Sequence, residues 1–273
     1  MASISKSEDA RFRFGENWQS FVATVTPEAI AEAERGIARL LPPDELRGRR
    51  VLDIGCGSGL SALAMLRQGA AAVDAIDLDP QSVAAATALL QAFAPGGAWS
   101  VRRADVLTLT PPAGARYDIV YSWGVLHHTG ALWRAVERAA AMLAPGGMLA
   151  VALYRRTPFC PLWRVEKRLY TRAGPAVQAA LRGAYKAGFA AALLATGRSP
   201  RGYVAGYRSA RGMDWHHDVH DWLGGYPYES ATPAEVVTRL ERLGLTPLRV
   251  FEHRAALGGL FGSHCDEYVA RKK

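Results

Sequence analysis

The chain has 273 residues, of which 49% are apolar and 21% charged, and its formal net charge is +8. This length suits one large domain, or a domain with a sizeable insertion. The longest apolar runs fall short of the ~18 residues of a membrane span, and the charged opening lacks the apolar core of a secretory signal. Three widely spaced cysteines, an odd number, favour a reducing cytoplasm over a disulfide framework.

Short apolar runs alternate with helical stretches along most of the chain. A first helix is expected over 27–41, where two prolines end it. Strands are expected at 51–54, 72–76, 99–102, 119–122 and 148–154, with helices at 61–68, 80–93 and 131–143 between them. A helix at 232–243 and strands at 246–251 and 267–270 follow. This alternation predicts βαβ units and a parallel sheet, hence an α/β fold.

A glycine-rich turn follows the first strand. The strand ends with Asp53, and Gly55, Gly57 and Gly59 come next in a G-x-G-x-G spacing. Glycines let the backbone turn tightly and approach a ligand closely. The spacing differs from the G-x-G-x-x-G of dinucleotide sites, which disfavours a nicotinamide dehydrogenase. An acidic residue before the turn suits a ligand that carries an ammonium group.

Polar residues also follow the next three strands. Asp77 ends the second strand, where a carboxylate can accept both hydroxyls of a ribose. Asp105 follows the third strand and can accept from an adenine amine, with a simple turn cap as the alternative. Ser122 ends the fourth strand, and His127 and His128 come soon after. Open α/β sheets bind ligands at this carboxyl edge.

Five motifs, VLDIGCGSG, AIDLD, RRADV, YDIVYSWGVLHH and LAPGGMLAV, resemble those of class I S-adenosylmethionine (SAM)-dependent methyltransferases in order and spacing. The resemblance covers about 50–154 well and the C-terminal part more loosely. It implies a Rossmann-like, seven-stranded, mostly parallel sheet with its last strand antiparallel, helices on both faces, and SAM as cofactor. The implied SAM contacts are Asp53, Gly55, Cys56, Gly57 and Gly59 to the methionine part, Asp77 and Leu78 to the ribose, Asp105 and Val106 to the adenine, and Ser122 and Trp123 beside the sulfonium.

The resemblance divides the chain into three parts. Residues 1–45 are expected to form an N-terminal lid, because RFRFGENWQSF is similar to a segment of bacterial small-molecule methyltransferases. Residues 46–154 and 231–273 are expected to form the SAM-binding domain. Residues 155–230 break the alternation and are interpreted as an inserted helical cap on the substrate side.

The insertion is strongly basic. Between 155 and 211 only Glu166 opposes twelve basic residues. A solvated helical face and an electropositive cap that attracts an anionic substrate, a lipid headgroup or nucleic acid are both consistent with this pattern. The run 176–195 is apolar and helix-permissive, and packing on the core is favoured over lying on a membrane surface. The basic residues are Arg155, Arg156, Arg164, Lys167, Arg168, Arg172, Arg182, Lys186, Arg198, Arg201, Arg208 and Arg211.

The segment 213–222 contains three histidines, three aspartates and two tryptophans. His216 and His220 are spaced to share a helical face, so a metal pair is an alternative to hydrogen-bonding histidines. No metal is expected as the main interpretation. The residues expected on the substrate side are Trp18, Tyr154, Trp215, His216 and Tyr226.

The predicted function is methyl transfer from SAM to an oxygen or nitrogen of a small or medium polar acceptor, with anionic acceptors favoured by the basic cap. His127, His128 and His217 are the candidate bases, since a histidine pKa suits proton removal near neutral pH. Three alternatives remain: a methyltransferase acting on RNA, one acting on a lipid-linked saccharide, and a SAM-binding protein without catalysis. The absence of an N/D-P-P-Y/F motif after the fourth strand disfavours nucleic acid. We expect a cytoplasmic protein, with peripheral membrane contact left open.

Overall fold

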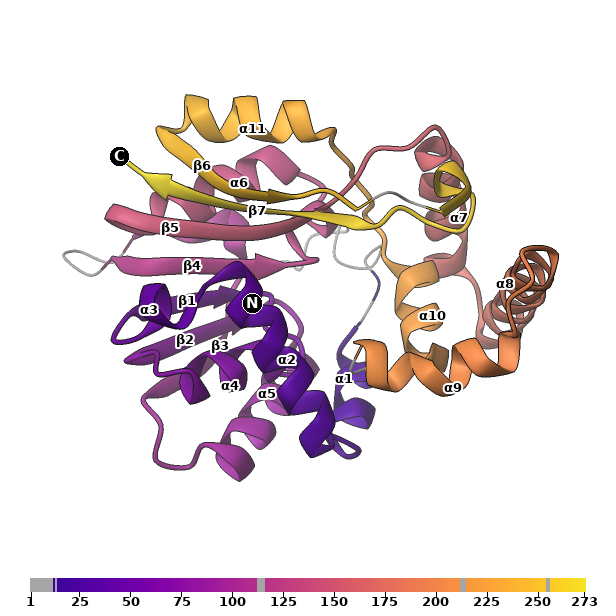
Figure 1. Cartoon of the computed structure of the whole chain (residues 1–273), viewed down its shortest axis with the longest axis horizontal. Helices are drawn as coiled ribbons and strands as arrows, with labels where there is room; N and C mark the ends of the chain where they lie inside the picture. Colours follow the sequence, from indigo (N-terminus) through magenta and orange to yellow (C-terminus); the bar gives the residue numbers. More distant parts are fainter. Residues whose placement is uncertain (1–11, 13, 112–115, 212–214, 254–255) are drawn as a thin grey trace, which may run out of the picture.

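The computed structural model describes residues 12, 14–111, 116–211, 215–253 and 256–273 (Figure 1). Its centre is a seven-stranded sheet with the order β3-β2-β1-β4-β5-β7-β6. Strands β1 to β5 are all parallel to one another, whereas β7 is antiparallel to both β5 and β6. The predicted fold class is therefore confirmed. The strands are β1 (Arg50–Ile54), β2 (Ala72–Asp77), β3 (Trp99–Arg103), β4 (Tyr117–Trp123), β5 (Leu143–Tyr154), β6 (Leu245–Phe251) and β7 (Cys265–Lys272).

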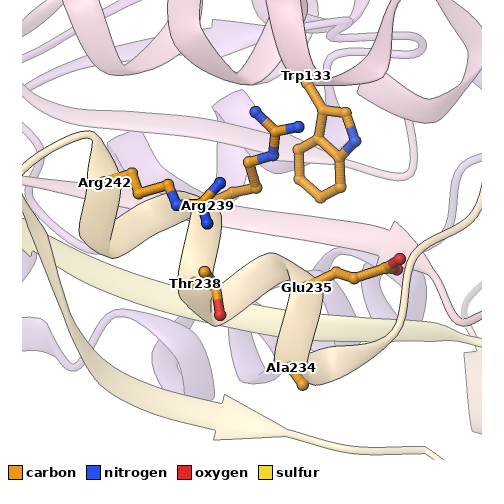
Figure 2. Close-up of a pocket in the computed structure, with 6 residues that line it drawn as sticks. All are labelled: Trp133, Ala234, Glu235, Thr238, Arg239 and Arg242. Carbon is orange, nitrogen blue, oxygen red and sulfur yellow. The ribbon is translucent and has the colours of Figure 1, made fainter.

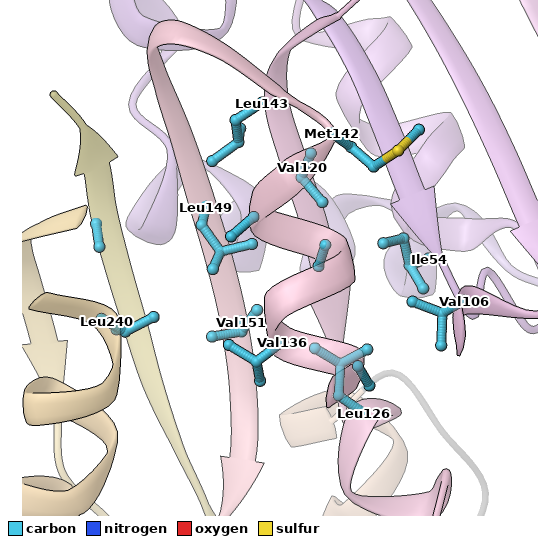
Figure 3. Packing of buried hydrophobic residues seen from close by; sticks show 14 of the residues in the cluster. Ile54, Val106, Val120, Leu126, Val136, Met142, Leu143, Leu149, Val151 and Leu240 are labelled. Carbon is cyan, nitrogen blue, oxygen red and sulfur yellow. The ribbon is translucent and has the colours of Figure 1, made fainter. Parts of the chain in front are cut away.

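Helices cover both faces of this sheet, as Figure 1 shows. One face packs against α2 (Pro27–Leu40), α3 (Pro43–Leu46), α4 (Leu60–Arg67) and α5 (Pro80–Phe93). The other packs against α6 (Leu132–Ala141), α11 (Pro233–Arg242) and the short turn η2 (Val106–Thr108). Figure 3 shows the second core, where Val120 and Leu149 of the sheet meet Val136 of α6. Burying each such side chain contributes about 1.5–3 kcal/mol.

Side-chain caps fix where several helices begin. The Thr26 hydroxyl accepts the Ala29 N–H at 3.3 Å, with a proline at the first helical position of α2. Asp79 caps α5 in the same way, through the Gln81 N–H at 2.9 Å. Thr232 forms a reciprocal capping box with Glu235 at the start of α11. These caps satisfy backbone N–H groups that have no partner inside the helix.

Strand β5 begins earlier than the sequence predicts. The sequence predicts the strand from 148, after a helix that ends at 143, but the strand already starts at Leu143. Tyr117 pairs with Leu143, and Ile119 pairs with Met148, so the register shifts between these pairs. The Pro145-Gly146-Gly147 sequence provides this irregularity, since a proline cannot donate to the ladder and glycine tolerates the φ of +75° at Gly146.

Four helices lie between β5 and α11, within the range predicted as a cap: α7 (Cys160–Arg172), α8 (Pro175–Ala195), α9 (Pro200–Arg211) and α10 (Trp215–Gly224). They share a core of their own, rich in aromatic rings, to which Trp163, Tyr170 and Trp215 contribute. Figure 1 shows α8 at the outer edge of the molecule, away from the sheet. Among the described residues, no helix has both the length and the apolarity needed to cross a bilayer.

Candidate functional site

The glycine-rich turn has a backbone that only glycine adopts easily. Gly55, Gly57 and Gly59 have φ values of +75°, +52° and +82°. Gly59 also lies directly against α5, because a Cβ added there would stand 2.9 Å from the Ala86 Cα. The turn therefore brings β1, the first turn of α4 and the side of α5 together at the carboxyl edge of the sheet.

Two carboxylates stand beside this turn. Asp77 accepts the Gly57 N–H at 3.0 Å and the Asp79 N–H at 2.9 Å, so it is fixed by the backbone. Asp53 is buried, and its Oδ2 has no hydrogen-bond partner among the described residues. Burial, followed by the charge of Asp77, raises the pKa of Asp53 to about 7. A cation or a hydrogen-bond donor at Oδ2 would offset the free-energy cost of burying this carboxylate.

The other predicted SAM residues follow the same edge. The Cys56 N–H donates to the Ile76 carbonyl, and the Cys56 thiol is buried. Leu78 is half-buried after β2. The Asp105 carboxylate accepts the Leu107 N–H at 2.9 Å and so caps η2, which is the turn-cap role that the sequence offered as the alternative to an adenine contact. Val106 is buried in the core. Neither fact tests an adenine contact, which stays a prediction.

Ser122 and Trp123, at the end of β4, point to different partners. The Ser122 hydroxyl is buried and donates to the Ile54 carbonyl at 2.9 Å, which ties β4 to the end of β1. The Trp123 indole donates to Glu267 of β7 at 2.8 Å. Trp123 is thus directed towards the β7 side of the sheet, and its place beside a sulfonium stays a prediction.

Helix α1 (Gly15–Val22) lies over the glycine-rich turn. The Gly15 N–H donates to the Asp79 carboxylate at 3.0 Å, and a Cβ added at Gly57 would stand 3.0 Å from the Trp18 ring. The Asn17 amide donates to buried Asp221 of α10 at 2.7 Å. Helix α1 therefore connects the turn with the cap. Trp18, predicted on the substrate side, lies against the predicted cofactor turn; residues 1–11 and 13 of the predicted lid lie outside the described part.

A group of rings lies beyond the ends of β4 and β5. His127 and His128 belong to the turn η3 (Leu126–His128), and Tyr154 ends β5. Ring centroids of His127 and Tyr154 are 3.8 Å apart, and those of His128 and Tyr154 are 5.3 Å apart. Tyr228, from the chain returning to the sheet, lies 5.3 Å from Tyr154. The structure thus brings together three residues that the sequence assigned to the acceptor side.

The two histidines have different hydrogen-bonding roles. The His127 Nδ1 accepts the Tyr154 N–H at 3.2 Å, so the neutral ring carries its proton on Nε2, which is buried without a described partner. The His128 Nδ1 lies 2.7 Å from the Pro227 carbonyl, which only accepts, so its proton is on Nδ1 and Nε2 keeps the lone pair. The Nε2 atom of His127 therefore carries a proton and that of His128 a lone pair, and the His128 ring packs against Gly225.

Burial keeps both histidines neutral. It lowers the pKa of His127 well below its usual value and the pKa of His128 to about 4, and the nearby charge of Lys167 acts in the same direction. The carbonyl of Pro227 partly opposes the shift at His128. Both rings are thus uncharged at neutral pH, and the low pKa makes His128 a weak base.

Lys167 is a functional candidate that the sequence counted only among the basic residues. Its side chain is completely buried, and its Nζ donates to the Trp222 carbonyl. The ammonium lies 4.3 Å from the Trp222 ring centroid, 5.3 Å from that of Tyr228 and 6.0 Å from that of Tyr154. Burial lowers its pKa to about 7, against the opposing charge of Glu166. The available signal was its helical spacing from Trp163 and Tyr170, both buried.

The remaining acceptor-side predictions fall elsewhere. Trp215 packs inside the cap, with its ring 5.1 Å from those of both Phe189 and Tyr207, and neither Trp215 nor His216 has a described contact with His127, His128 or Tyr154. Their place on the acceptor side stays a prediction. Tyr226 is half-buried in the loop between α10 and α11 and accepts the Phe12 N–H through its carbonyl. The side chain of His217 lies outside the described part.

The alternative metal pair has no support in the described contacts. The His216 Nδ1 lies 2.7 Å from the Lys186 Nζ, and the His220 Nδ1 lies 2.6 Å from the Tyr170 hydroxyl. A neighbouring ammonium disfavours a cation at His216. Within the part of the chain that the structure describes, no three His, Cys, Asp or Glu side chains are grouped as metal ligands.

A hollow of about 390 Å³ lies between α6 and α11, outside both groups. Figure 2 shows the Arg239 guanidinium beside the Trp133 ring in this hollow, and the guanidinium carbon lies 5.3 Å from the ring centroid. Its lining contains none of the residues that the sequence predicted for cofactor or acceptor. It is therefore a separate surface feature, lined by Trp133, Ala234, Glu235, Thr238, Arg239 and Arg242.

Comparisons with known proteins agree with this geometry. Residues 51–147 match the family model of a methyltransferase domain. A ubiquinone biosynthesis O-methyltransferase of Azorhizobium caulinodans is 32% identical over 170 residues, which is 57% of this chain and 65% of that protein. One of Chelativorans sp. (strain BNC1) is 36% identical over 110 residues, 40% of this chain and 42% of that protein. The chain thus spans about half the length of such relatives.

Solved structures share the fold at low identity. A magnesium protoporphyrin IX methyltransferase from Synechocystis PCC 6803 with bound SAH has a TM-score of 0.55 at 15% identity, covering 100% of this chain and 90% of that one. An N-methyltransferase from Bradyrhizobium japonicum WM9 in complex with S-adenosyl-L-homocysteine has a TM-score of 0.53 at 16% identity, covering 89% and 86%. Residues 51–147 therefore form a methyltransferase domain, and its motifs and fold are similar to those of class I SAM-dependent methyltransferases.

Proposed function

We propose that this chain binds SAM at the glycine-rich turn and transfers its methyl group to an oxygen or nitrogen of a small or medium polar acceptor. The observation that carries the proposal is Asp53, whose buried Oδ2 lacks a partner beside the turn. The ammonium of a methionine moiety supplies both the positive charge and the donor that this oxygen lacks. The residues present therefore fit the cofactor, which supplies an activated methyl group on a sulfonium.

The chain's own residues hold this ligand in a definite orientation. Asp77 is fixed by two backbone N–H groups and retains lone pairs that can accept ribose hydroxyls. Helix α1, held to Asp79 and to Asp221, covers the turn and excludes water from it. Methyl transfer is an in-line displacement, so most of the catalysis that the protein supplies is proximity and orientation.

Binding of SAM is tested with Asp77→Ala. The substitution removes both ribose acceptors, and we expect SAM affinity to fall by about 1–3 kcal/mol, or roughly 5- to 150-fold, by isothermal titration calorimetry. Asp44→Ala, which removes an exposed carboxylate from α3, is the matched control and should bind like the wild type. Unchanged affinity in Asp77→Ala would refute the ribose assignment.

On the acceptor side, His127 and His128 have complementary roles. The His127 Nε2–H is placed to donate to the acceptor, and the His128 Nε2 to take its proton. The relatives named as O-methyltransferases support an oxygen as the methylated atom. The basic cap supports an acceptor with anionic character. A phenol-like hydroxyl meets these conditions, because a base as weak as His128 works best on an acidic proton.

Turnover of single variants tests these roles. Acceptors are first found by incubating the chain with methyl-labelled SAM and a panel of phenols and amines, with mass spectrometry of any co-purified ligand. We then expect His128→Ala to lower kcat by roughly 10²- to 10⁴-fold while SAM affinity is retained. His127→Ala should raise KM as well, because a donor to the acceptor is lost, and His217→Ala is compared beside them. Wild-type turnover in all three would place the acceptor elsewhere, and SAM binding without turnover of any acceptor would favour a non-catalytic protein.

A further inference from the structure

The outer surface of the cap exposes large aliphatic side chains on two consecutive helices. On α7, Leu162, Val165 and Leu169 are 60%, 56% and 63% exposed, and their spacing places them on one side of the helix. The opposite side carries Trp163, Lys167 and Tyr170, which are buried in the cap core. The exposed leucines and valines are therefore not needed to hold α7 in place.

Helix α8 follows α7 in the chain and also exposes aliphatic side chains. It has 21 residues, about 31 Å at 1.5 Å per residue, and Leu193 is its buried residue. Val177 and Leu194 are 54% and 64% exposed, at opposite ends of the helix. Its charged residues, Arg182 and Lys186, are both directed to the cap, where they contact Tyr170 and His216. The outward side of α8 is thus uncharged over its whole length, which is unusual for a surface helix in water.

Arginines border this apolar surface. Arg168 and Arg172 lie beside the exposed side chains of α7, and Arg198 and Arg201 follow the end of α8. All four are exposed, and within the described residues none has a carboxylate at ion-pair distance. By contrast, Arg155 and Arg156 at the base of the cap are paired with Glu252 and Glu235. The four arginines next to the apolar surface thus have no described carboxylate partner that would neutralise them.

We propose that the outer surface of α7 and α8 docks on an anionic membrane surface, with the aliphatic side chains entering the interface and the four arginines contacting lipid headgroups. Interfacial helices combine these two features, an apolar side and a cationic border. A second copy of the chain is a poorer occupant, because a symmetric contact would bring the two sets of arginines together. RNA is also poorer, since the exposed residues are aliphatic and offer no rings on which bases stack.

The inference goes beyond the proposed methyl transfer and does not depend on it. It would place the cap at a lipid surface, with α7 between that surface and the ring group of Tyr154, Tyr228 and Lys167. An acceptor with an apolar tail could then be taken up directly from the lipid phase. The surface residues are distinct from those proposed to bind SAM or the acceptor, so the two proposals can fail separately.

The test is flotation of the full chain with two kinds of vesicle. One contains phosphatidylcholine alone, and in the other about one lipid in three is phosphatidylglycerol. We expect binding to the anionic vesicles, little binding to phosphatidylcholine, and a decline as salt is raised. L162S/V165S/L169S should weaken binding by roughly 50-fold, and R168Q/R172Q by roughly tenfold. The control L248S/V250S changes two exposed residues of β6 and should bind like the wild type.

Four results would overturn the proposal: equal binding to both vesicles, equal binding of the L162S/V165S/L169S variant, a dimer in light scattering that L194S dissociates, and salt-sensitive binding to single-stranded RNA without vesicle binding. SAM titrations of the same variants separate the two proposals. Retained SAM affinity with lost vesicle binding supports the membrane surface. Retained vesicle binding in Asp77→Ala, with lost SAM affinity, shows that the docking surface works without the cofactor.

Discussion

The two sides of the site hold their charged groups by different means. On the sheet side, Asp77 and Asp79 accept backbone N–H groups whose positions are set by β2, α1 and the glycine-rich turn. On the cap side, Lys167 is held by one carbonyl and by aromatic rings. Backbone donors cannot move without disturbing a whole element, whereas ring packing can rearrange side chain by side chain. The sheet side is thus preformed. On the cap side the side chains can rearrange, and the amine of Lys167 has a pKa of about 7, close to neutral pH.

The largest effect should come from Lys167→Met. The folded pKa of this amine, about 7, is below its unfolded value of ~10.4, so between these values the unfolded chain binds more protons and wild-type stability rises with pH. We expect wild type to gain roughly 3 kcal/mol over the variant from pH 7 to pH 10. Chemical denaturation at several pH values measures the difference in unfolding free energy.

Two features keep this measurement specific. Burial raises the pKa of Glu166 to about 7, so its titration changes the unfolding free energy mainly below pH 7. In the variant, loss of the Lys167 ammonium raises the Glu166 pKa further, which also lowers the stability of the variant relative to wild type as pH rises. Arg168→Met, an exposed cation on the same helix, is the control and should show no such slope. A pH-independent difference between wild type and Lys167→Met would mean that the amine is not desolvated in the folded protein.

On the sheet side, the sharpest test is Gly59→Ala. The new Cβ would lie 2.9 Å from the Ala86 backbone, at a φ of +82°, so strain and overlap add. We expect a loss of about 2–4 kcal/mol in unfolding free energy. Gly124→Ala is the matched control, because its φ is +75° but nothing lies within 4 Å of the added Cβ, and it should cost about 1–2 kcal/mol. Equal losses would show that α5 can move away from the turn, and that the sheet side is not preformed.

The smallest effect concerns the connection between the two sides. Asn17→Ala removes the donor to buried Asp221, and we expect a loss of about 1–2 kcal/mol in thermal or chemical unfolding. Gln19→Ala changes an exposed residue of the same helix and should stay within about 0.5 kcal/mol of wild type. If Asn17→Ala instead behaves like its control, helix α1 is held by Asp79 and not by the cap.

The sheet side could be predicted from sequence because its signals are local. Thr26, Asp79 and Thr232 are residue types that favour helix N-caps, and each caps a helix; the apolar runs give six of the seven strands to within two residues. The glycines at 55, 57 and 59 require positive φ, which the structure confirms. Only β5 differs, since its irregular register depends on pairing with β4.

The cap could not be predicted in the same detail because its arrangement depends on contacts between distant residues. For example, Trp215 lies in the cap core through ring packing with Phe189 and Tyr207, which no local pattern in the sequence indicates. The role of Lys167 depends on Trp222, 55 residues away, whose carbonyl accepts from its amine. The opposite tautomers of His127 and His128 follow from Tyr154 and Pro227, which no local pattern connects with them.

The position of β7 affects how the sheet is assembled during synthesis. This strand follows β6 in the chain but lies between β5 and β6 in the sheet. As the chain emerges from the ribosome, β5 therefore presents an open edge, and β6 has no neighbour to join until β7 has been made. An open edge of this kind pairs readily with other chains. A ribosome that stalls between β6 and β7 would release a sheet with the edge of β5 open and β6 unpaired, which is prone to aggregate, so the synthesis of β7 completes the sheet.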